Sequence, residues 1–543
     1  MKKKFRVVAL LLALVFVFTA CGKSGDSGSG EAGEQVLKVN NSAEPDTLHP
    51  GLAQGTHEGW PIYHMFEGLM RWGSNGELEE AAAESFEVND DKTKYTFKLR
   101  EGLKWSDGEP VTAADYEYAW KHAMKKETAS NYAFILTDYI KNGPEYAEGK
   151  IDDVEQVGVK ALDDTTLEVE LNHPTTFFPE LTAFYTYMPI PKHIAESNPD
   201  WHKTPENYVT NGPFQLEKWD HNSKIVLKKN PEFRDAENVK LAKIDMDILD
   251  DKNTEWQKYE NNEYHLVNSP QPDVVSKLRK EKNEELHIDE MLSTYFYSFN
   301  TERKPFNNAK VRKALSMAID RGTITENITQ AGQRPAEGIV PFGFNDENGK
   351  DFRESSGNLI QEDIAEAQKL LEEGLKEEGM TKEEAFAGKS ILFNTDESHR
   401  NIAQAVQEMW KKNLGVDVQL ENSEFKVVIS RTRAHDFDIA RTGWISDYRD
   451  PISMINLWVK NGEMNDAAYD NDEFNQLIST ATISPDQAVR MQSMRDAEKI
   501  LMDDMPIMPL YHYVSPWVVK SNVKGVYKDK LNYPTLTYAE IEG

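Results

Sequence analysis

Cysteine is almost absent from this sequence, since its 543 residues include only one, Cys21. A single cysteine cannot form an internal disulfide, so the fold must be stabilised by packing and hydrogen bonds. The hydrophobic content of 39% in so long a chain is ample for a large core and for more than one domain. A small disulfide-stapled fold is therefore excluded.

Positive charge is also scarce. Lys and Arg number 62 against 92 Asp and Glu, which gives a formal net charge of -30. Nucleic acids and anionic lipid headgroups are bound by surfaces rich in Lys and Arg. We therefore expect no nucleic-acid partner, and we interpret the acidity as a source of solubility.

Local catalytic and metal-binding motifs are missing as well. The sequence has no G-x-x-x-x-G-K-[ST] loop, no H-E-x-x-H, no G-x-S-x-G and no dinucleotide fingerprint. Its 13 histidines are scattered, without a carboxylate or cysteine at convincing ligand spacing. We therefore expect no enzyme, no metal and no cofactor. A secreted enzyme such as a peptidase, with catalytic residues far apart in the sequence, stays an alternative.

Long apolar runs are limited to one, near the first residue. Residues 7–18 (VVALLLALVFVF) follow four basic residues and precede the small residues 19–21 (TAC). The run is shorter than the roughly 20 residues that a membrane helix needs, and this order is that of a secretory signal. We predict a signal peptide over 1–20, with an uncleaved anchor or a plain secreted protein as the alternative. Residues 22–35 (GKSGDSGSGEAGEQ) read as a flexible tether.

The remaining sequence alternates between short strands and helices. Period-two patterns predict strands over 95–99, 166–171, 224–228 and 244–249, and helical spacing predicts helices over 311–319, 363–375 and 402–414. Residues 390–394 and 416–420 flank the last helix and read as a strand–helix–strand crossover. At residues 105–115, a turn at Ser106-Asp107-Gly108 precedes a helix that Thr112 caps, with Asp115 at the capping-box position. Mixed order of this kind indicates an α/β fold.

Several distinctive strings occur in a fixed order. They are 44–50 (EPDTLHP), 66–69 (FEGL), 99–115 (LREGLKWSDGEPVTAAD), 211–214 (NGPF), 311–321 (VRKALSMAIDR), 443–448 (GWISDY) and 509–513 (PLYHY). Together they resemble the family 5 extracellular solute-binding proteins, in particular the oligopeptide-binding lipoproteins of bacterial ABC peptide importers. The resemblance runs from about Val36 to the last residue.

The resemblance implies a periplasmic-binding-protein-like α/β fold of type II (cluster C), a two-lobed Venus flytrap with an extra inserted domain. Residues 36–66, 191–292 and 515–543 would form lobe I, 67–190 the inserted domain and 293–514 lobe III. The chain would cross between the lobes near Ser293 and Val514, where we expect the hinge. The same resemblance makes Cys21 the lipidated first residue of the mature protein. Residues 21–35 would then comprise this cysteine and a flexible linker.

A binding protein for many peptides must hold the groups that all peptides share. A buried ammonium needs a carboxylate, and the resemblance assigns this role to Asp447. It places Gly443 and Ile445, with Trp444 between them, on an edge that pairs with the peptide backbone, and Thr56 on the facing edge in lobe I. Three aromatic residues would lie in the pocket: Phe425, Tyr132 and Tyr513. Phe425 could equally belong to the ordinary core.

The carboxylate end of the ligand is less constrained. By resemblance Arg441 would neutralise it, or His399 for a longer peptide, although Arg441 could instead be an internal salt-bridge partner. A lysine of the family is missing, because the corresponding residues 326–329 read ENIT. The preferred peptide length therefore stays open.

The expected function is a lipid-anchored, monomeric solute-binding protein on the extracytoplasmic face of the bacterial membrane. It would bind short peptides between two closing lobes and deliver them to an ABC permease. A receptor for one signalling peptide and a receptor for another solute, such as nickel, haem or a sugar, are the alternatives.

Overall fold

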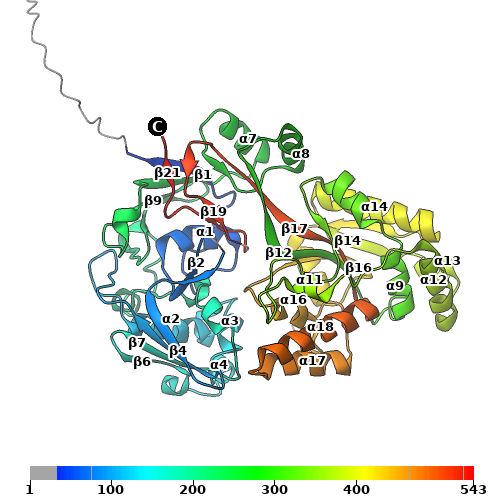
Figure 1. Ribbon diagram of the computed structural model, residues 1–543, viewed down its shortest axis with the longest axis horizontal. Coiled ribbons are helices and arrows are strands. Elements are labelled where there is room, and N and C mark those ends of the chain that lie inside the picture. The colour runs from blue at the N-terminus through cyan, green and yellow to red at the C-terminus, as the bar shows by residue number, and fades with distance from the viewer. Residues whose placement is uncertain (1–33, 75, 463, 530) are drawn as a thin grey trace, which may run out of the picture. The chain divides into compact units, whose positions relative to one another are not determined.

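The computed structural model describes residues 34–543 apart from 75, 463 and 530, and Gln35–Gly543 form one compact unit. The predicted signal peptide and Cys21 lie outside the described residues, as does almost all of the linker. Three main sheets organise this unit, and we take them in turn (Figure 1).

The first sheet has four strands in the order β1-β10-β9-β8. Their bounds are β1 (Val36–Asn40), β10 (Lys243–Asp247), β9 (Lys224–Lys229) and β8 (Phe214–Asp220). β1 pairs with β10 in parallel, and the other pairs are antiparallel. Helix α1 (Thr56–Met65) contacts β8 of this sheet. The pairing of β1 with β10 brings together segments that are about 200 residues apart in the sequence.

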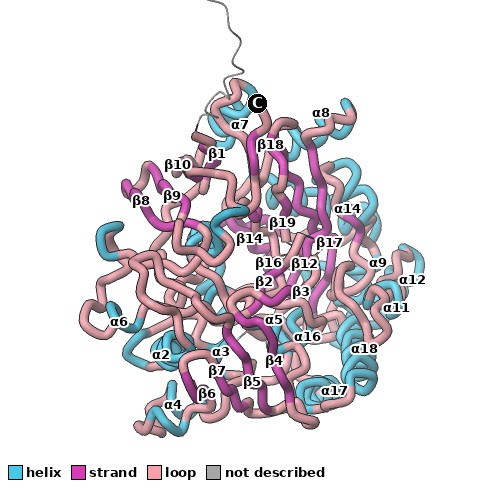
Figure 2. The backbone as a smooth tube through the Cα atoms, turned by 60° about the vertical axis from the view of Figure 1, so that its left-hand side comes forward, coloured by secondary structure: helices cyan, strands magenta, loops and turns pink. Residues whose placement is uncertain are grey.

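The second sheet lies within the predicted inserted domain and has the order β4-β5-β7-β6. The strands are β4 (Ala83–Val88), β5 (Lys94–Leu99), β7 (Thr166–Glu170) and β6 (Val159–Asp163). Alternate residues of β5 and β7 are buried, as the period-two pattern predicted. Helix α2 (Ala113–Met124) packs against β6 and β7 (Figure 2). The carboxylate of Asp115 accepts the Thr112 N–H (2.8 Å), which confirms the predicted capping box.

The third sheet contains the strands that approach the candidate site. Its order is β11-β17-β12-β16-β14-β15, and β13 (Arg334–Pro335) pairs with β17. The bounds are β11 (Leu266–Val267), β17 (Ile507–Val519), β12 (Leu286–Phe299), β16 (Ile439–Ile445), β14 (Ser390–Asn394) and β15 (Gln419–Ser423). The predicted strand–helix–strand crossover is confirmed, since β14 and β15 pair in parallel around α14 (Glu397–Leu414). The second strand was predicted too early, because Gly415 ends α14 and Val416 and Val418 pack in the core before β15 begins.

The two faces of the third sheet contact different cores. Tyr295 and Tyr297 of β12 pack with α9 (Ala309–Met317), α12 (Ile364–Glu378) and α14. Phe296 points to the opposite face and packs with the segment that carries α16 (Ile452–Ile455), α17 (Asp472–Ile483) and α18 (Gln487–Asp504). This alternation follows from the two-residue period of a strand and explains why the second half of β12, Met291–Phe299, is buried on both faces.

Two long neighbouring strands connect the regions. β12 and β17 pair along most of their lengths, and their register shifts between Glu290 and Thr294, opposite Val514 and His512 (Figure 1). This irregularity coincides with the two positions expected to form the hinge. The last residues then return to the first sheet, where Trp60 Nε1 donates to Pro534 O (2.8 Å).

Candidate functional site

Among the described residues, no strand pairs with one edge of β16 over its second half, and we call this its free edge. β12 pairs along its full length, whereas β14 pairs only with its first two residues. The main-chain groups of successive residues in an antiparallel pair point alternately toward and away from the partner. The Ser446 N–H donates to Leu292 O (2.8 Å), which places the even-numbered residues on the β12 side. The N–H and C=O groups of Gly443 and Ile445 therefore point away from β12, toward the free edge.

Asp447 lies two residues beyond the end of β16. Its N–H donates to the hydroxyl of Ser453 (3.1 Å). Burial raises the pKa of its carboxyl from 3.8 to about 7. Asp447 is only partly exposed, and no cation among the described residues forms an ion pair with its carboxyl. An ionised carboxyl in such surroundings is unfavourable, so this position favours the arrival of a positively charged group.

Several phenols lie close to this carboxyl. Burial raises the pKa of each phenol, and the negative charge of Asp447 raises it further, for Tyr132, Tyr139, Tyr185, Tyr448 and Tyr533. The predicted residue Tyr132 is thus brought to Asp447 from a segment more than 300 residues away. Sequence reasoning missed the other four. Tyr448 was detectable as the neighbour of Asp447, but the other three come from segments with no local signal.

Arg441 lies at the other end of the free edge. Its Nη2 donates to the Tyr513 hydroxyl (3.0 Å) and its Nη1 to Asn394 Oδ1 (3.3 Å). Its guanidinium carbon lies 4.8 Å from the centre of the Tyr295 ring. Among the described residues no carboxylate forms an ion pair with Arg441, and its Nε is buried without a hydrogen-bond partner. The alternative of an internal salt bridge is therefore wrong for this part of the chain.

His399 lies beside the same cluster. Its ring centre is 5.6 Å from that of Tyr295. Burial, and then the charge of Arg441, lowers the pKa of His399 to about 4. The imidazole is therefore neutral at pH 7 until an anion approaches it. The structure thus brings together three predicted residues: Arg441, His399 and Tyr513.

Two other predicted residues lie in unexpected surroundings. Phe425 is the first residue of α15 (Phe425–Arg433) and is 58% exposed, so its alternative assignment to the core is wrong. Thr56 is the first residue of helix α1 and does not lie on a strand edge, so this expectation is wrong as well. The chain is extended only as far as Gly55, and the acidic Glu58 lies in the first helical turn, where it favours helix initiation. The first-turn N–H groups of α1 have no partner within the helix.

Trp444 lies on the face of β16 opposite Arg441. Its side chain is partly buried against the core that contains Phe296, and its carbonyl accepts a hydrogen bond from Ser293 Oγ (2.6 Å). Its indole N–H is buried and has no partner among the described residues. A donor of this kind can be satisfied by a ligand or by water.

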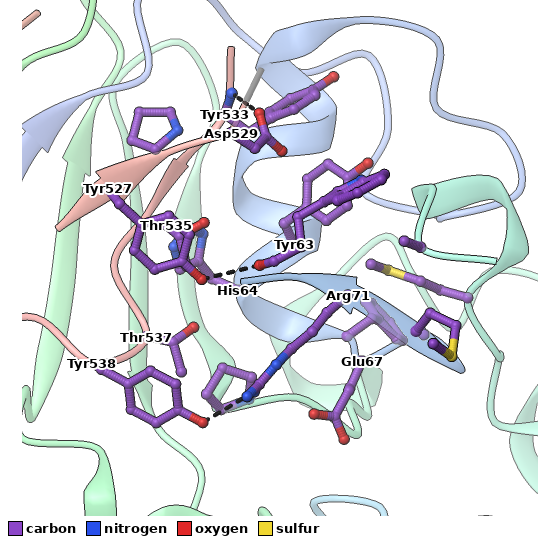
Figure 3. A pocket seen from close by; sticks show the side chains of 18 of the residues that line it. Tyr63, His64, Glu67, Arg71, Tyr527, Asp529, Tyr533, Thr535, Thr537 and Tyr538 are labelled. Atoms are coloured by element: carbon purple, nitrogen blue, oxygen red, sulfur yellow. Dashed lines mark hydrogen bonds between the residues drawn. The ribbon is translucent and has the colours of Figure 1, made fainter. Parts of the chain in front are cut away.

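A small cavity of about 80 Å³ is lined by Tyr533, one of the phenols near Asp447. It lies between α1, β2 (Met70–Trp72) and the C-terminal segment (Figure 3). Tyr63, Tyr533 and Asp529 lie at one end, and Glu67 and Arg71 at the other. Glu67 accepts two hydrogen bonds from Arg234 (both 2.8 Å), and Arg71 pairs with Glu79 (3.3 Å). The charges at the second end are thus already compensated within the protein.

Within residues 34–543 and outside the three gaps, no cluster of His, Cys, Asp or Glu could hold a metal ion. No helix in the same part of the chain is long and apolar enough to cross a bilayer. The candidate site brings together a free strand edge, a carboxyl among phenols, and a guanidinium with a histidine.

The family profile described as "Bacterial extracellular solute-binding proteins, family 5 Middle" matches residues 77–466. The chain belongs to this family. The oligopeptide-binding protein OppA of Bacillus subtilis (strain 168) is 43% identical over 538 residues, which cover 97% of each chain. The family 5 assignment therefore rests on nearly the whole length.

Solved structures of similar proteins agree. Haemophilus influenzae OppA in complex with RPPGFSPFR has a TM-score of 0.78 and 32% identity, and the match covers 94% of this chain and 99% of that one. The pheromone receptor PrgZ, solved for its mode of peptide binding, has a TM-score of 0.80 and 26% identity, with coverage of 94% and 100%. The predicted type II periplasmic-binding fold is thereby confirmed.

Proposed function

We propose that this chain captures short peptides between two lobes and delivers them to the permease of an ABC importer. The observation that carries the proposal is the geometry along β16. A free main-chain edge at Gly443 and Ile445 lies between the carboxyl of Asp447 and the guanidinium of Arg441. These are the partners required by a peptide backbone, an ammonium and a carboxylate.

An extended peptide would add to β16 as an antiparallel strand. Its ammonium would pair with Asp447, and its backbone would bond to Gly443 and Ile445, which makes the affinity independent of its side chains. Arg441 lies six residues before Asp447, a distance of about 20 Å along an extended strand. A peptide of about five or six residues spans this distance, and His399 would accept the carboxylate of a longer one.

Relatives support this proposal. The B. subtilis relative is named an oligopeptide-binding protein, and the H. influenzae structure contains the nonapeptide RPPGFSPFR. Phe425 is exposed, which is compatible with a contact to ligand side chains. The N–H groups at the start of α1, near Thr56, would supply the facing contact in lobe I.

Lobe closure would follow ligand binding. We assign the domains as predicted, with 36–66, 191–292 and 515–543 in lobe I, 67–190 inserted and 293–514 in lobe III. The register shift in β12 and β17 supports a hinge near Ser293 and Val514. A peptide that contacts both lobes only in the closed form shifts the population toward that form, which the permease would recognise.

The cellular setting is part of the proposal. Cys21 would carry the lipid that anchors a monomer to the extracytoplasmic face of the membrane, and residues 22–35 would tether it there. Replacing Cys21→Ser should release the protein from the membrane fraction into the medium. Retention of the variant on the membrane would contradict the lipid anchor.

Native mass spectrometry of the purified protein tests the proposed function. Denaturation of the complex should release a mixture of short peptides, whose sequencing reports the length range. A protein that contains no peptide, and ignores a peptide library in titration, would overturn the proposal. Cleavage of the added peptides would instead indicate a peptidase.

A receptor for one signalling peptide is the second candidate. The similarity to the pheromone receptor PrgZ favours it, because that fold match spans nearly the whole of both chains. Release of one defined peptide, or selective affinity for one member of a random library, would support this candidate.

A further inference from the structure

The loop that contains Asp447 contacts the inserted domain. We call residues 446–450 the latch loop, and we call Tyr139, Thr176, Phe177 and Glu180 of the inserted domain the latch seat. The rings of Tyr448 and Phe177 stack with centres 4.8 Å apart and an angle of 4° between their planes. The hydroxyls of Tyr448 and Tyr139 form a hydrogen bond of 2.8 Å. All three rings are at least nine-tenths buried.

Charged residues extend this contact on both sides. The Arg449 N–H donates to Glu180 Oε2 (3.1 Å), and its guanidinium donates to Gly76 O and lies 4.7 Å from the centre of the Trp72 ring. In α18, Arg490 donates to Thr176 Oγ1 (3.1 Å). The same guanidinium is fixed by Asp450, through two hydrogen bonds of 3.0 and 3.1 Å.

The contact between the latch loop and the latch seat includes a buried ion pair, which is unusual for a loose contact between two domains. Arg490 is 1% exposed and Asp450 is 4% exposed, so the ion pair that aims Arg490 at Thr176 is fully enclosed. Breaking the contact would expose the Phe177 and Tyr448 rings to water at the same time. Exposure of buried aromatic surface costs free energy, so the contact resists separation. The latch loop also contains Asp447, so the loop and the carboxyl must move as one.

We infer that the latch loop and latch seat form a closure latch, in which the inserted domain holds lobe III shut after a peptide ammonium reaches Asp447. This inference rests on the proposed function. It gives the inserted domain a role that needs no contact with the peptide. The inference requires these bonds to break when the lobes open, so that they lower the rate at which peptide escapes and raise the apparent affinity.

A double-mutant cycle tests the latch. Tyr139→Phe and Tyr448→Phe each remove one hydroxyl of the shared hydrogen bond, and each should accelerate peptide dissociation about fivefold, the usual weight of one such bond. The double variant should be no faster than either single variant, because both remove the same interaction. Thr176→Val should act independently and add to either change.

The matched control is Tyr116→Phe. Tyr116 is a buried tyrosine of the same domain that donates to Glu67 O (3.2 Å), and the charged groups that shift its pKa all lie outside lobe III. It should lower thermal stability without changing peptide dissociation. If the Tyr139 and Tyr448 variants also change only stability, the contact is a static domain interface and the latch is refuted.

Inter-lobe distance supplies a second readout. In a Cys21→Ser background, which has no other cysteine, Asp90→Cys and Glu383→Cys place spin labels on exposed positions of the inserted domain and lobe III. With peptide present, Tyr448→Phe should enlarge the long-distance population, and an unchanged distribution would refute the latch. Failure of the unsubstituted protein to bind any peptide would instead refute the proposed function.

Discussion

Replacement of Asp447 by asparagine should weaken peptide binding and stabilise the empty protein at the same time. Asparagine has nearly the same shape as aspartate but carries no charge. The carboxylate is therefore removed as a partner for the peptide ammonium and also as a buried charge. A residue whose role was purely structural would not produce both effects.

The stability change follows from the pKa. Raising the carboxyl pKa from 3.8 to about 7 disfavours its ionised form by up to about 4 kcal/mol. The penalty is absent below pH 4, where the group is protonated in the folded and unfolded states alike. It grows as the pH rises from about 4 to 7 and is complete above pH 7. At pH 8 the Asp447→Asn protein should therefore melt up to about 4 °C higher than the unsubstituted protein.

The binding change has the opposite sign. Loss of one partner of a buried ion pair costs about 3–5 kcal/mol, so the dissociation constant should rise at least 100-fold. Titration calorimetry with a five-residue peptide measures the dissociation constant, and scanning fluorimetry from pH 4 to 8 measures stability.

Burial also raises the pKa of Glu180 to about 7 and that of Asp529 to about 6, so some pH dependence will persist. The reasoning is refuted if the variant binds normally, or if its melting temperature follows pH as the unsubstituted protein does. Asp466→Asn is the control, because burial also raises the pKa of this lobe III carboxyl, and peptide affinity should not change.

Three further outcomes follow from the same structure. Arg441→Met should weaken binding of a free-acid peptide about 10- to 100-fold and leave the C-terminally amidated peptide unaffected, as measured by calorimetry; equal losses for both would exclude Arg441 as the carboxylate partner. His399→Gln should make the empty protein more stable at pH 5, because the pKa of His399 is lowered from 6.5 to about 4 and stability is lost as pH falls between these values; a pH-independent difference would contradict this assignment. N-terminal acetylation of the peptide should abolish binding to the unsubstituted protein, and retained affinity would exclude Asp447 as the ammonium partner.

The local elements could be derived from the sequence because their signals are local. The capping box at Thr112 and Asp115 and the alternation of β5 depend on residues within one turn or one strand. Helix α12 was predicted within a few residues of its bounds, because Asp363 caps it and its apolar residues recur at helical spacing. The start of β15 was misplaced because two buried valines precede it in a loop, and burial alone does not distinguish a strand from a packed loop.

The candidate site was only partly accessible to the same reasoning. Asp447, Arg441 and Gly443 were found through the resemblance to a known family, and they lie on β16 or two residues beyond its end, so their proximity required no tertiary information. Thr56 was assigned to an edge and lies at a helix start instead. The outcome for Phe425 was undecided in the sequence, because an aromatic residue suits either a core or an exposed binding surface.

By itself, the sequence determined the element types, the family and the charged groups along one strand. Each of these depends on residues close together in the chain or on a string that can be recognised. Only the tertiary structure decided that β14 leaves the second half of β16 free, that Tyr185 and Tyr533 join Tyr132 around Asp447, and that Tyr448 stacks on Phe177. Those contacts join segments up to about 300 residues apart, and such pairs are selected by the packing of whole domains, which no local pattern encodes.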